Sequence, residues 1–158
     1  MIEFTAYGRP VTQGSKTIGR ARDGRPFVRE SSKGWAAWRD TVTTAARAAR
    51  GRMPTLTGPV EVGLLFVFAR PVGHYGTGRN AALLLPSAPA FPGTKGTGDI
   101  DKLTRAVFDC LTAAGVIEDD ARVVETVQRK VWSAPGGREG VRVVVRPMPT
   151  GRTGSVLL

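Results

Sequence analysis

The chain has 158 residues, 41% of them hydrophobic, and this length and composition suit one globular domain with its own core. Its 23 Lys and Arg outnumber its 13 Asp and Glu, and the net charge of +10 favours a polyanionic partner such as nucleic acid. No apolar run approaches the roughly 20 residues that cross a bilayer, and no signal-peptide pattern opens the chain. We therefore expect a cytoplasmic protein with no membrane partner, in which Cys110, the one cysteine, is a reduced core thiol.

The first third of the chain predicts a strand, an irregular segment and a helix. Residues 2–7 alternate apolar and polar side chains, which is typical of a strand. Residues 8–30 are rich in Gly, Pro and Arg and predict a loop or an irregular hairpin. A helix should follow, capped by Ser31 or Ser32 and ending near Arg50. One helical face, which we expect in the core rather than stacked on bases, comprises Trp35, Trp38, Val42, Ala45, Ala46 and Ala49.

The rest of the chain predicts three strands, a second helix and one long irregular segment. Residues 59–69 are almost wholly apolar, as in a central strand covered on both faces. Residues 70–98 show no regular pattern. An apolar stripe at helical spacing then predicts a helix that ends at Gly115. Two β-rich runs, 122–132 and 141–146, are joined by a turn-forming segment and are expected to form a hairpin.

This order, β-α-β-α-β-β, predicts a single α+β (mixed α/β) domain over residues 1–147, followed by a flexible tail at 148–158. Its core should be a small mixed sheet of about four strands with two main packed helices. The long segment 70–98 has two interpretations: a flap that covers bound DNA, or a decoration packed on the protein through Leu83, Leu84 and Leu85.

Negative charge is concentrated around the second helix, because seven of the 13 acidic residues lie between positions 99 and 125. Asp99 and Asp101 precede the helix, where residues two apart in extended chain point the same way. Asp119 and Asp120 follow it, and they complete a cluster if the next strand folds back beside the start of the helix. An all-oxygen site of this kind suits Mg²⁺ or Mn²⁺, and carboxylate-held metals are a recurring device for phosphodiester hydrolysis.

The same carboxylates have ordinary structural interpretations. Asp101 is a good helix N-cap, Asp99 is favoured by the helix dipole, and Asp119 and Asp120 suit an exposed turn. His74 is the one histidine, which excludes catalytic sites built on paired histidines. No G-x-x-x-x-G-K-[ST] loop is present, so we expect no nucleotide cofactor.

Residues 99–125, DIDKLTRAVFDCLTAAGVIEDDARVVE, resemble the signature of the RusA family of Holliday-junction resolvases. That signature reads D-x-D-N-x-x-K-x-x-x-D-x-L followed by G-x-x-x-D-D-x-x-V. Residues 24–47 are more loosely similar to the segment in which a basic hairpin leads into the family's first helix. The chain departs from the pattern at Lys102, where the family has Asn, and at Arg105, where it has Lys.

The resemblance implies a small homodimeric Mg²⁺-dependent endonuclease that cuts four-way DNA junctions with paired nicks, as do relatives encoded by many phages and prophages. It also implies a mixed sheet with packed helices. The family's catalytic metal-binding aspartates correspond to Asp99, Asp101 and Asp120, with Asp119 at the neighbouring acidic position. Arg105 lies one helical turn after Asp101, where a cation could contact the scissile phosphate.

We therefore expect an endodeoxyribonuclease that resolves Holliday junctions or other branched DNA, with Mg²⁺ as cofactor and Mn²⁺ as a substitute. Two alternatives remain: a non-catalytic nucleic-acid-binding module of the same fold, and a metal-dependent phosphoryl-transfer enzyme that acts on nucleotides. The cations expected to contact DNA are Lys16, Arg20, Arg22, Arg25, Arg29, Arg79, Lys95 and Lys102.

Overall fold

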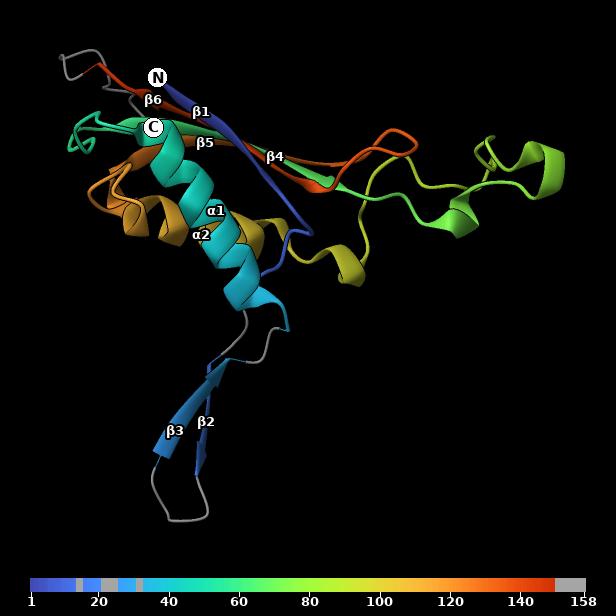
Figure 1. Ribbon diagram of the computed structural model, residues 1–158, viewed down its shortest axis with the longest axis horizontal. Coiled ribbons are helices and arrows are strands. Elements are labelled where there is room, and N and C mark those ends of the chain that lie inside the picture. Colours follow the sequence, from blue (N-terminus) through green and yellow to red (C-terminus); the bar gives the residue numbers. More distant parts are fainter. Residues whose placement is uncertain (14–15, 21–25, 31–32, 150–158) are drawn as a thin grey trace, which may run out of the picture.

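The computed structural model describes residues 1–13, 16–20, 26–30 and 33–149, with side chains described in 1–13 and 33–149. Its centre is a four-stranded sheet in the order β1-β6-β4-β5, with both helices on one face (Figure 1). The sheet strands are β1 (Ile2–Tyr7), β4 (Val60–Phe68), β5 (Val123–Trp132) and β6 (Gly140–Pro147), and the helices are α1 (Trp35–Arg50) and α2 (Ile100–Ala113). Strands β2 (Lys16–Arg20) and β3 (Pro26–Glu30) form a separate antiparallel pair. The predicted α+β fold and its element order are confirmed.

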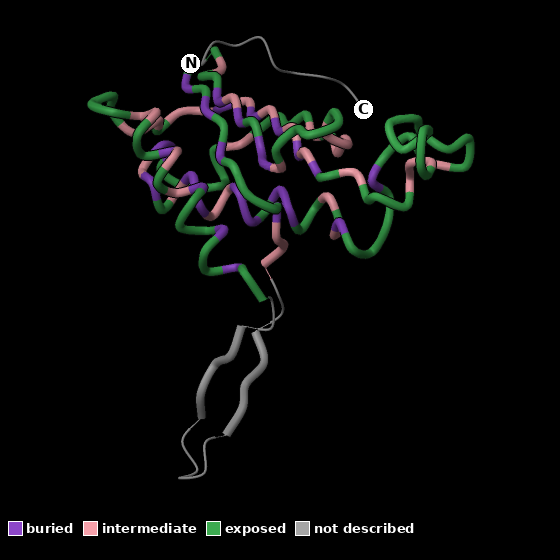
Figure 2. The backbone as a smooth tube through the Cα atoms, turned by 45° about the vertical axis from the view of Figure 1, so that its right-hand side comes forward, coloured by how far each residue is buried: buried purple, intermediate pink, exposed green. Residues whose placement is uncertain are grey.

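Strand β4 has one buried face and one half-buried face. Its even-numbered residues, from Val60 to Phe68, are buried, whereas the odd-numbered residues between them are half-buried. Alternate residues of a strand point to opposite faces, so the buried set faces α1 and α2. The expectation that this strand is covered on both faces is therefore wrong, because both helices lie on the same side of the sheet. Figure 2 shows the buried backbone gathered between sheet and helices.

The last two strands do not pair with each other, so the predicted hairpin is wrong. Strand β5 pairs in parallel with β4, while β6 inserts between β4 and β1 and is antiparallel to both. A parallel neighbour needs a crossover connection, and α2 supplies it. The inward side chains of β6, Val141, Val143 and Val145, are fully buried, which a central position provides and an edge position does not.

Helix α1 begins later than the sequence predicts. Its N-cap is Gly34, in the left-handed region with φ 87°, and Ser31 and Ser32 lie outside the described residues. The predicted end at Arg50 is confirmed. Trp35 and Trp38 are 4% and 3% exposed, which confirms that they belong to the core and excludes them as base-stacking surfaces. No helix in the described part of the chain is long and apolar enough to cross a membrane.

The C-terminal end of α2 is fixed by hydrogen bonds that close a Schellman motif. The amide of Val116 donates to Leu111 O and that of Gly115 to Thr112 O, each at 2.9 Å, and Gly115 has φ 70°. Arg50 of α1 donates from Nη1 to Ala114 O at 3.5 Å, so the two helices are joined at this end. Cys110 is buried in the same helix, and burial raises the pKa of its thiol to about 11.

The segment between β4 and α2 is an outlying arm with three single-turn 3₁₀ helices, η1 (Val72–His74), η2 (Gly78–Asn80) and η3 (Lys95–Thr97). A bridge between Tyr75 and Leu84 closes its outer part. Leu83, Leu84 and Leu85 are 62%, 51% and 38% exposed, which contradicts the interpretation of residues 70–98 as a decoration packed on the protein through these leucines. Its inner end is held differently, by a hydrogen bond of 3.0 Å from Trp132 Nε1 to Pro89 O.

Replacing Gly115 by Ala should destabilise the protein by about 1–2 kcal/mol, because a side chain is disfavoured in the left-handed region. An added Cβ would also lie 3.0 Å from Arg50 Nη1 and disturb the contact between the helices. The free energy of unfolding, measured in urea, tests this. Gly73→Ala is the matched control, since nothing lies within 4 Å of its added Cβ. Equal unfolding midpoints for the two variants would contradict the prediction.

Candidate active site

Asp99 and Asp101 lie together at the N-terminal end of α2 and line a cavity of about 680 Å³. Asp99 is the N-cap residue, with extended backbone, and its side chain makes no capping bond. The alternative in which Asp101 caps the helix is therefore wrong, since Asp101 lies inside the first turn. Both residues are exposed, so their carboxylates are accessible to an ion or a substrate from solvent.

Asp99 is paired with a cation on the same helix. Lys102 Nζ donates to Asp99 Oδ2 at 2.7 Å. This hydrogen bond, and then the charge of the same ammonium, hold the pKa of the Asp99 carboxyl below its ordinary value, while Asp99 raises the pKa of Lys102. The Asp99 carboxylate is thus ionised at neutral pH, and a metal ion would compete with Lys102 for one of its oxygens.

The opposite wall of the cavity comes from β5 and was not predicted from the sequence. Gln128, Arg129 and Lys130 line it. Lys130 Nζ donates to Gly98 O at 2.8 Å, and the Thr104 hydroxyl of α2 donates to Gln128 Oε1. The sequence did contain a signal for these wall residues. Gln128 and Lys130 are polar residues at alternate positions of β5, on the face that packs against the helices. These bonds fix the start of α2 against β5.

Asp119 and Asp120 lie at the other end of α2. The helix has 14 residues and is therefore about 20 Å long at a rise of ~1.5 Å per residue. Beyond it, Asp119 caps the 3₁₀ turn η4 (Asp120–Arg122), and its Oδ1 accepts a hydrogen bond of 2.8 Å from Ala121 N. Strand β5 starts directly after this turn, at Val123, and reaches the cavity only at Gln128.

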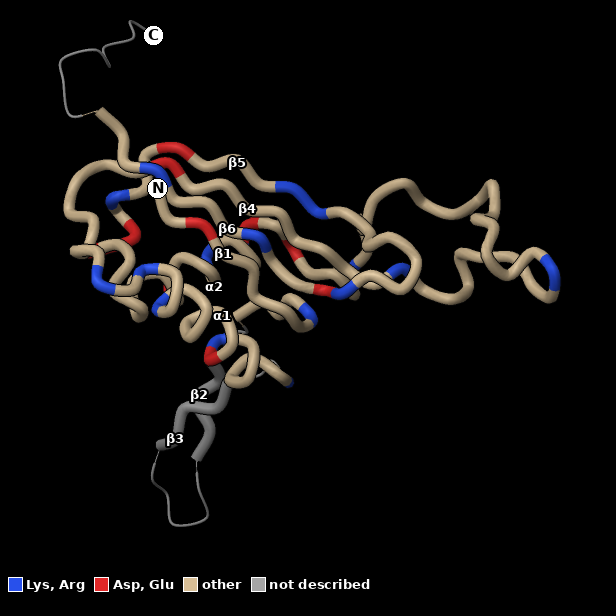
Figure 3. Tube along the Cα trace, turned by 45° about the horizontal axis from the view of Figure 1, so that its top comes forward, with Lys and Arg blue, Asp and Glu red and all other residues tan. Residues whose placement is uncertain are grey.

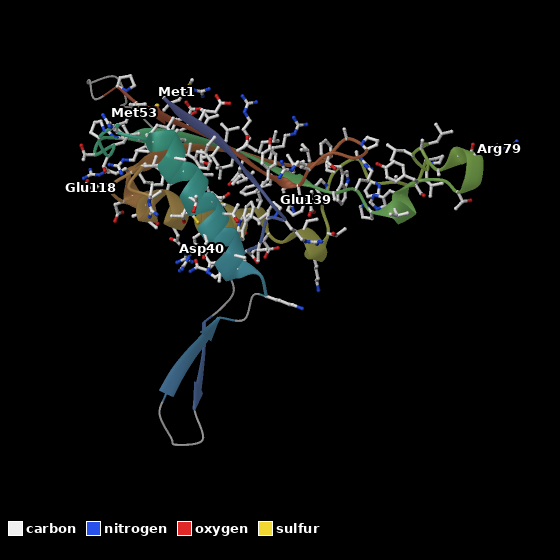
Figure 4. All side chains as sticks on the ribbon, viewed as in Figure 1. Met1, Asp40, Met53, Arg79, Glu118 and Glu139 are labelled. Carbon is white, nitrogen blue, oxygen red and sulfur yellow. The ribbon has the colours of Figure 1, made fainter. Side chains whose placement is uncertain are left out.

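The four aspartates therefore do not converge within one chain. Among the residues that the structure describes, no three or more His, Cys, Asp or Glu side chains are placed to hold one metal ion. Each end of α2 instead presents one exposed aspartate pair. Figure 4 labels the neighbouring Glu118 at the end of the molecule opposite Arg79. One chain alone does not provide the predicted four-carboxylate site.

The predicted DNA-contacting cations are spread over the molecule. Lys95 lines the cavity, Lys102 is paired with Asp99, and Arg105 is exposed one turn after Asp101. Arg79 lies at the tip of the arm (Figure 4), far from the cavity. Lys16, Arg20 and Arg29 lie in β2 and β3, where only the backbone is described, and Arg22 and Arg25 lie outside the described residues.

Charge changes sign along β5 (Figure 3). Glu125 lies near its start, close to the turn that carries Asp119 and Asp120, and Arg129 and Lys130 follow in its second half. The cavity therefore joins two carboxylates at the start of α2 to three cations, Lys95, Arg129 and Lys130. Carboxylates that attract a metal ion, set among cations that attract phosphates, are the complementary parts of a phosphodiester-cleaving site.

Comparison with protein families gives a match to the model described as endodeoxyribonuclease RusA over residues 8–146. This range contains both aspartate pairs, the cavity and all the strands of the sheet except β1 and the last residue of β6. A search of curated proteins gives no match.

Replacing Lys102 by Gln should raise the pKa of Asp99 towards the ordinary Asp range, because the Lys102 ammonium is the main cause of its depression. A titration of carboxyl ¹³C shifts by NMR measures this. Lys95→Gln is the matched control, since Lys95 lines the same cavity but is not among the causes of the shift. An Asp99 pKa that does not change when Lys102 is replaced would show that the pair does not persist in solution.

Proposed function

Because the chain belongs to the RusA family of endodeoxyribonucleases, which resolve Holliday junctions, we propose that it cuts branched DNA at the cavity that Asp99 and Asp101 line. The observation that carries this placement is the joint presence of two exposed carboxylates and three cations around one cavity of about 680 Å³. The carboxylates suit a hard divalent cation, and the cations suit the phosphates on either side of a scissile bond.

We propose Mg²⁺ as the cofactor, with Mn²⁺ as a substitute, held by Asp99, Asp101 and Asp120, and with Asp119 beside them. When bound, the ion would supply an activated water and neutralise charge on the phosphate. The chain's own residues hold the substrate. Arg105 lies on the exposed side of α2 one turn after Asp101, where its guanidinium can bind the scissile phosphate. Its planar guanidinium makes paired contacts to phosphate oxygens that the family's Lys does not.

The separation of the two aspartate pairs supports a dimer with shared active sites. Asp101 lies in the first turn of α2 and Asp120 follows the other end of this helix, which is about 20 Å long, so we infer that one chain does not direct both at one ion. In a homodimer with a two-fold axis across α2, the two helices run antiparallel. Asp99 and Asp101 of one protomer then approach Asp119 and Asp120 of its partner, and the symmetry forms two such sites.

The exposed side of α2 is suited to this pairing. Asp101, Arg105 and Thr112 lie one above another along the helix, the first two exposed and the third half-buried. An antiparallel copy places the negative N-terminal part of this stripe near Asp119 and Asp120 of its partner, and a bound cation would offset the repulsion between these carboxylates. Two equivalent sites also match a four-way junction, which offers two symmetry-related strands to cut.

The variants Asp101→Asn and Asp120→Asn should each lose cleavage, because an amide binds Mg²⁺ far more weakly than a carboxylate. Both residues are exposed, so both variants should fold. A mixed dimer of the two variants should regain cleavage, since one of its shared sites carries both substitutions and the other carries none. Nicking of a synthetic four-way junction by co-expressed, differently tagged chains measures this, and we expect single nicks instead of paired ones.

The reciprocal control is the double variant Asp101→Asn/Asp120→Asn paired with an unchanged chain. With shared sites, each site has one lesion, so this mixed dimer should not cut. If each chain instead holds a complete site, the outcomes reverse: the first mixture stays inactive and the second makes single nicks. Near-normal cleavage by either homodimeric single variant would remove that aspartate from the reaction.

We also propose that the β2–β3 hairpin region binds DNA through Lys16, Arg20, Arg22, Arg25 and Arg29. Exchanging the four arginines for Gln should weaken junction binding and reduce the slope of log affinity against log salt by roughly one unit for each phosphate that is no longer bound. Cleavage at saturating protein should change little, because these residues are not part of the proposed metal site. Binding measured over a salt series tests this, and an unchanged slope would assign DNA binding to other cations.

A further inference from the structure

The wall of the cavity contains an exposed aromatic ring that the proposed chemistry does not use. Phe91 is 55% exposed, although the side chain of a phenylalanine usually lies in a core. The guanidinium of Arg129 lies over this ring, 5.4 Å from its centroid. Both residues line the same cavity as Asp99 and Asp101. An aromatic ring and an arginine together offer a flat stacking surface and a positive charge beside the proposed reaction centre.

The segment that carries Phe91 is fixed in place. The Thr97 side chain, 6% exposed, donates its hydroxyl towards Pro92 O at 2.7 Å and Thr94 O at 2.8 Å. Lys130 Nζ binds Gly98 O at 2.8 Å, and Arg9 Nη2 binds Gly96 O at 2.9 Å. Strand β5 and the segment after β1 therefore both hold residues 92–98 in position. The ring is presented by a preformed structure, not by an unsupported loop.

The size and charge of the cavity suit one nucleotide. Its volume of about 680 Å³ falls within the range of roughly 300–1,000 Å³ that small-molecule sites occupy. Lys95 and Lys130 supply charge for phosphate oxygens, and Gln128 supplies a side-chain amide that can pair with a base edge. An apolar peptide would offer no anion to Lys95 and Arg129, whereas a nucleotide offers both a phosphate and a base edge.

We propose that this cavity holds one unstacked nucleotide of the branched substrate, with its base on Phe91 and its phosphate among Lys95, Arg129 and Lys130. The proposal rests on the placement of the reaction at Asp99 and Asp101. Taking a base out of a stack costs least where it is already poorly stacked, as beside a branch point, and most within a regular duplex. The cavity thus favours branched over linear DNA and sets the position of the cut relative to the captured base.

The test places the fluorescent base 2-aminopurine at each position next to the mapped cut in a four-way junction, with EDTA present to prevent cleavage. Fluorescence at one position should rise on binding of the unchanged protein, and Phe91→Ala should abolish the rise. The same variant should reduce junction cleavage at subsaturating protein by about tenfold or more, the usual scale for removal of one base-stacking aromatic. Affinity for linear duplex should not change, and Phe91→Trp should restore junction cleavage.

Tyr7→Ala is the matched control. Tyr7 is 50% exposed and has Arg138 over its ring at 3.8 Å, but it lies in β1, at the opposite edge of the sheet from β5. It should behave as the unchanged protein in every assay. Two results would overturn the nucleotide site and leave the proposed function intact, provided that the junction is cut normally. One is that no position gives a fluorescence rise, and the other is a rise that persists in Phe91→Ala. Equal decreases of junction and duplex affinity in Phe91→Ala also overturn the nucleotide site, and absence of any junction cleavage by the unchanged protein overturns both proposals.

Discussion

The parallel pairing of β4 and β5 is the constraint on which the rest of the molecule depends. Parallel neighbours require a crossover, and the crossover here contains the helix α2, which is closed by a Schellman motif at Gly115 and fixed against β5 by Lys130 and Gln128. A helix of this length separates Asp99 and Asp101 at its start from Asp119 and Asp120 beyond its end. The two aspartate pairs are therefore kept apart by the same element that holds each of them in place, and this separation is the reason for proposing a shared site in a dimer.

The acidic residues around α2 are tolerated in a strongly basic chain because all of them except the half-buried Asp109 are exposed, and because Asp99 and Glu118 are paired with cations. Lys102 neutralises Asp99, and Arg122 donates from Nε to Glu118 Oε2 at 2.9 Å at the other end of α2. Exposed pairs of this kind contribute little to stability, typically below about 1 kcal/mol. They can consequently be rearranged by a metal ion or a phosphate at small cost. The cavity wall is instead held by hydrogen bonds to the backbone, in which Lys130 donates to Gly98 O and Thr97 donates to Pro92 O.

The sequence predicted those features that depend on local periodicity. The strand at 2–7, the core tryptophans of α1 and the apolar stripe of α2 are confirmed, because each is set by side-chain spacing within one element. Features set by partners distant in the chain were missed or wrong. The last two strands were expected to pair because they are neighbours in sequence, whereas burial of Val141, Val143 and Val145 places β6 in the middle of the sheet. Phe91 and Arg129 went unnoticed because 38 positions separate them and neither belongs to a motif.

The arm between β4 and α2 has an outer part and an inner part, and the inner part is hydrogen-bonded to the sheet. Its outer part exposes Leu83 and Leu84 and is closed on itself by a bridge. Its inner part is tied to the sheet at Pro89, whose carbonyl accepts hydrogen bonds from Trp132 Nε1 at 3.0 Å and Arg70 Nη1 at 3.1 Å. Because this anchor lies between the leucines and Phe91, displacement of the outer part need not move the cavity wall. The anchor thereby separates the outer arm from the geometry at Asp99, so a change in the outer arm need not disturb the proposed reaction centre.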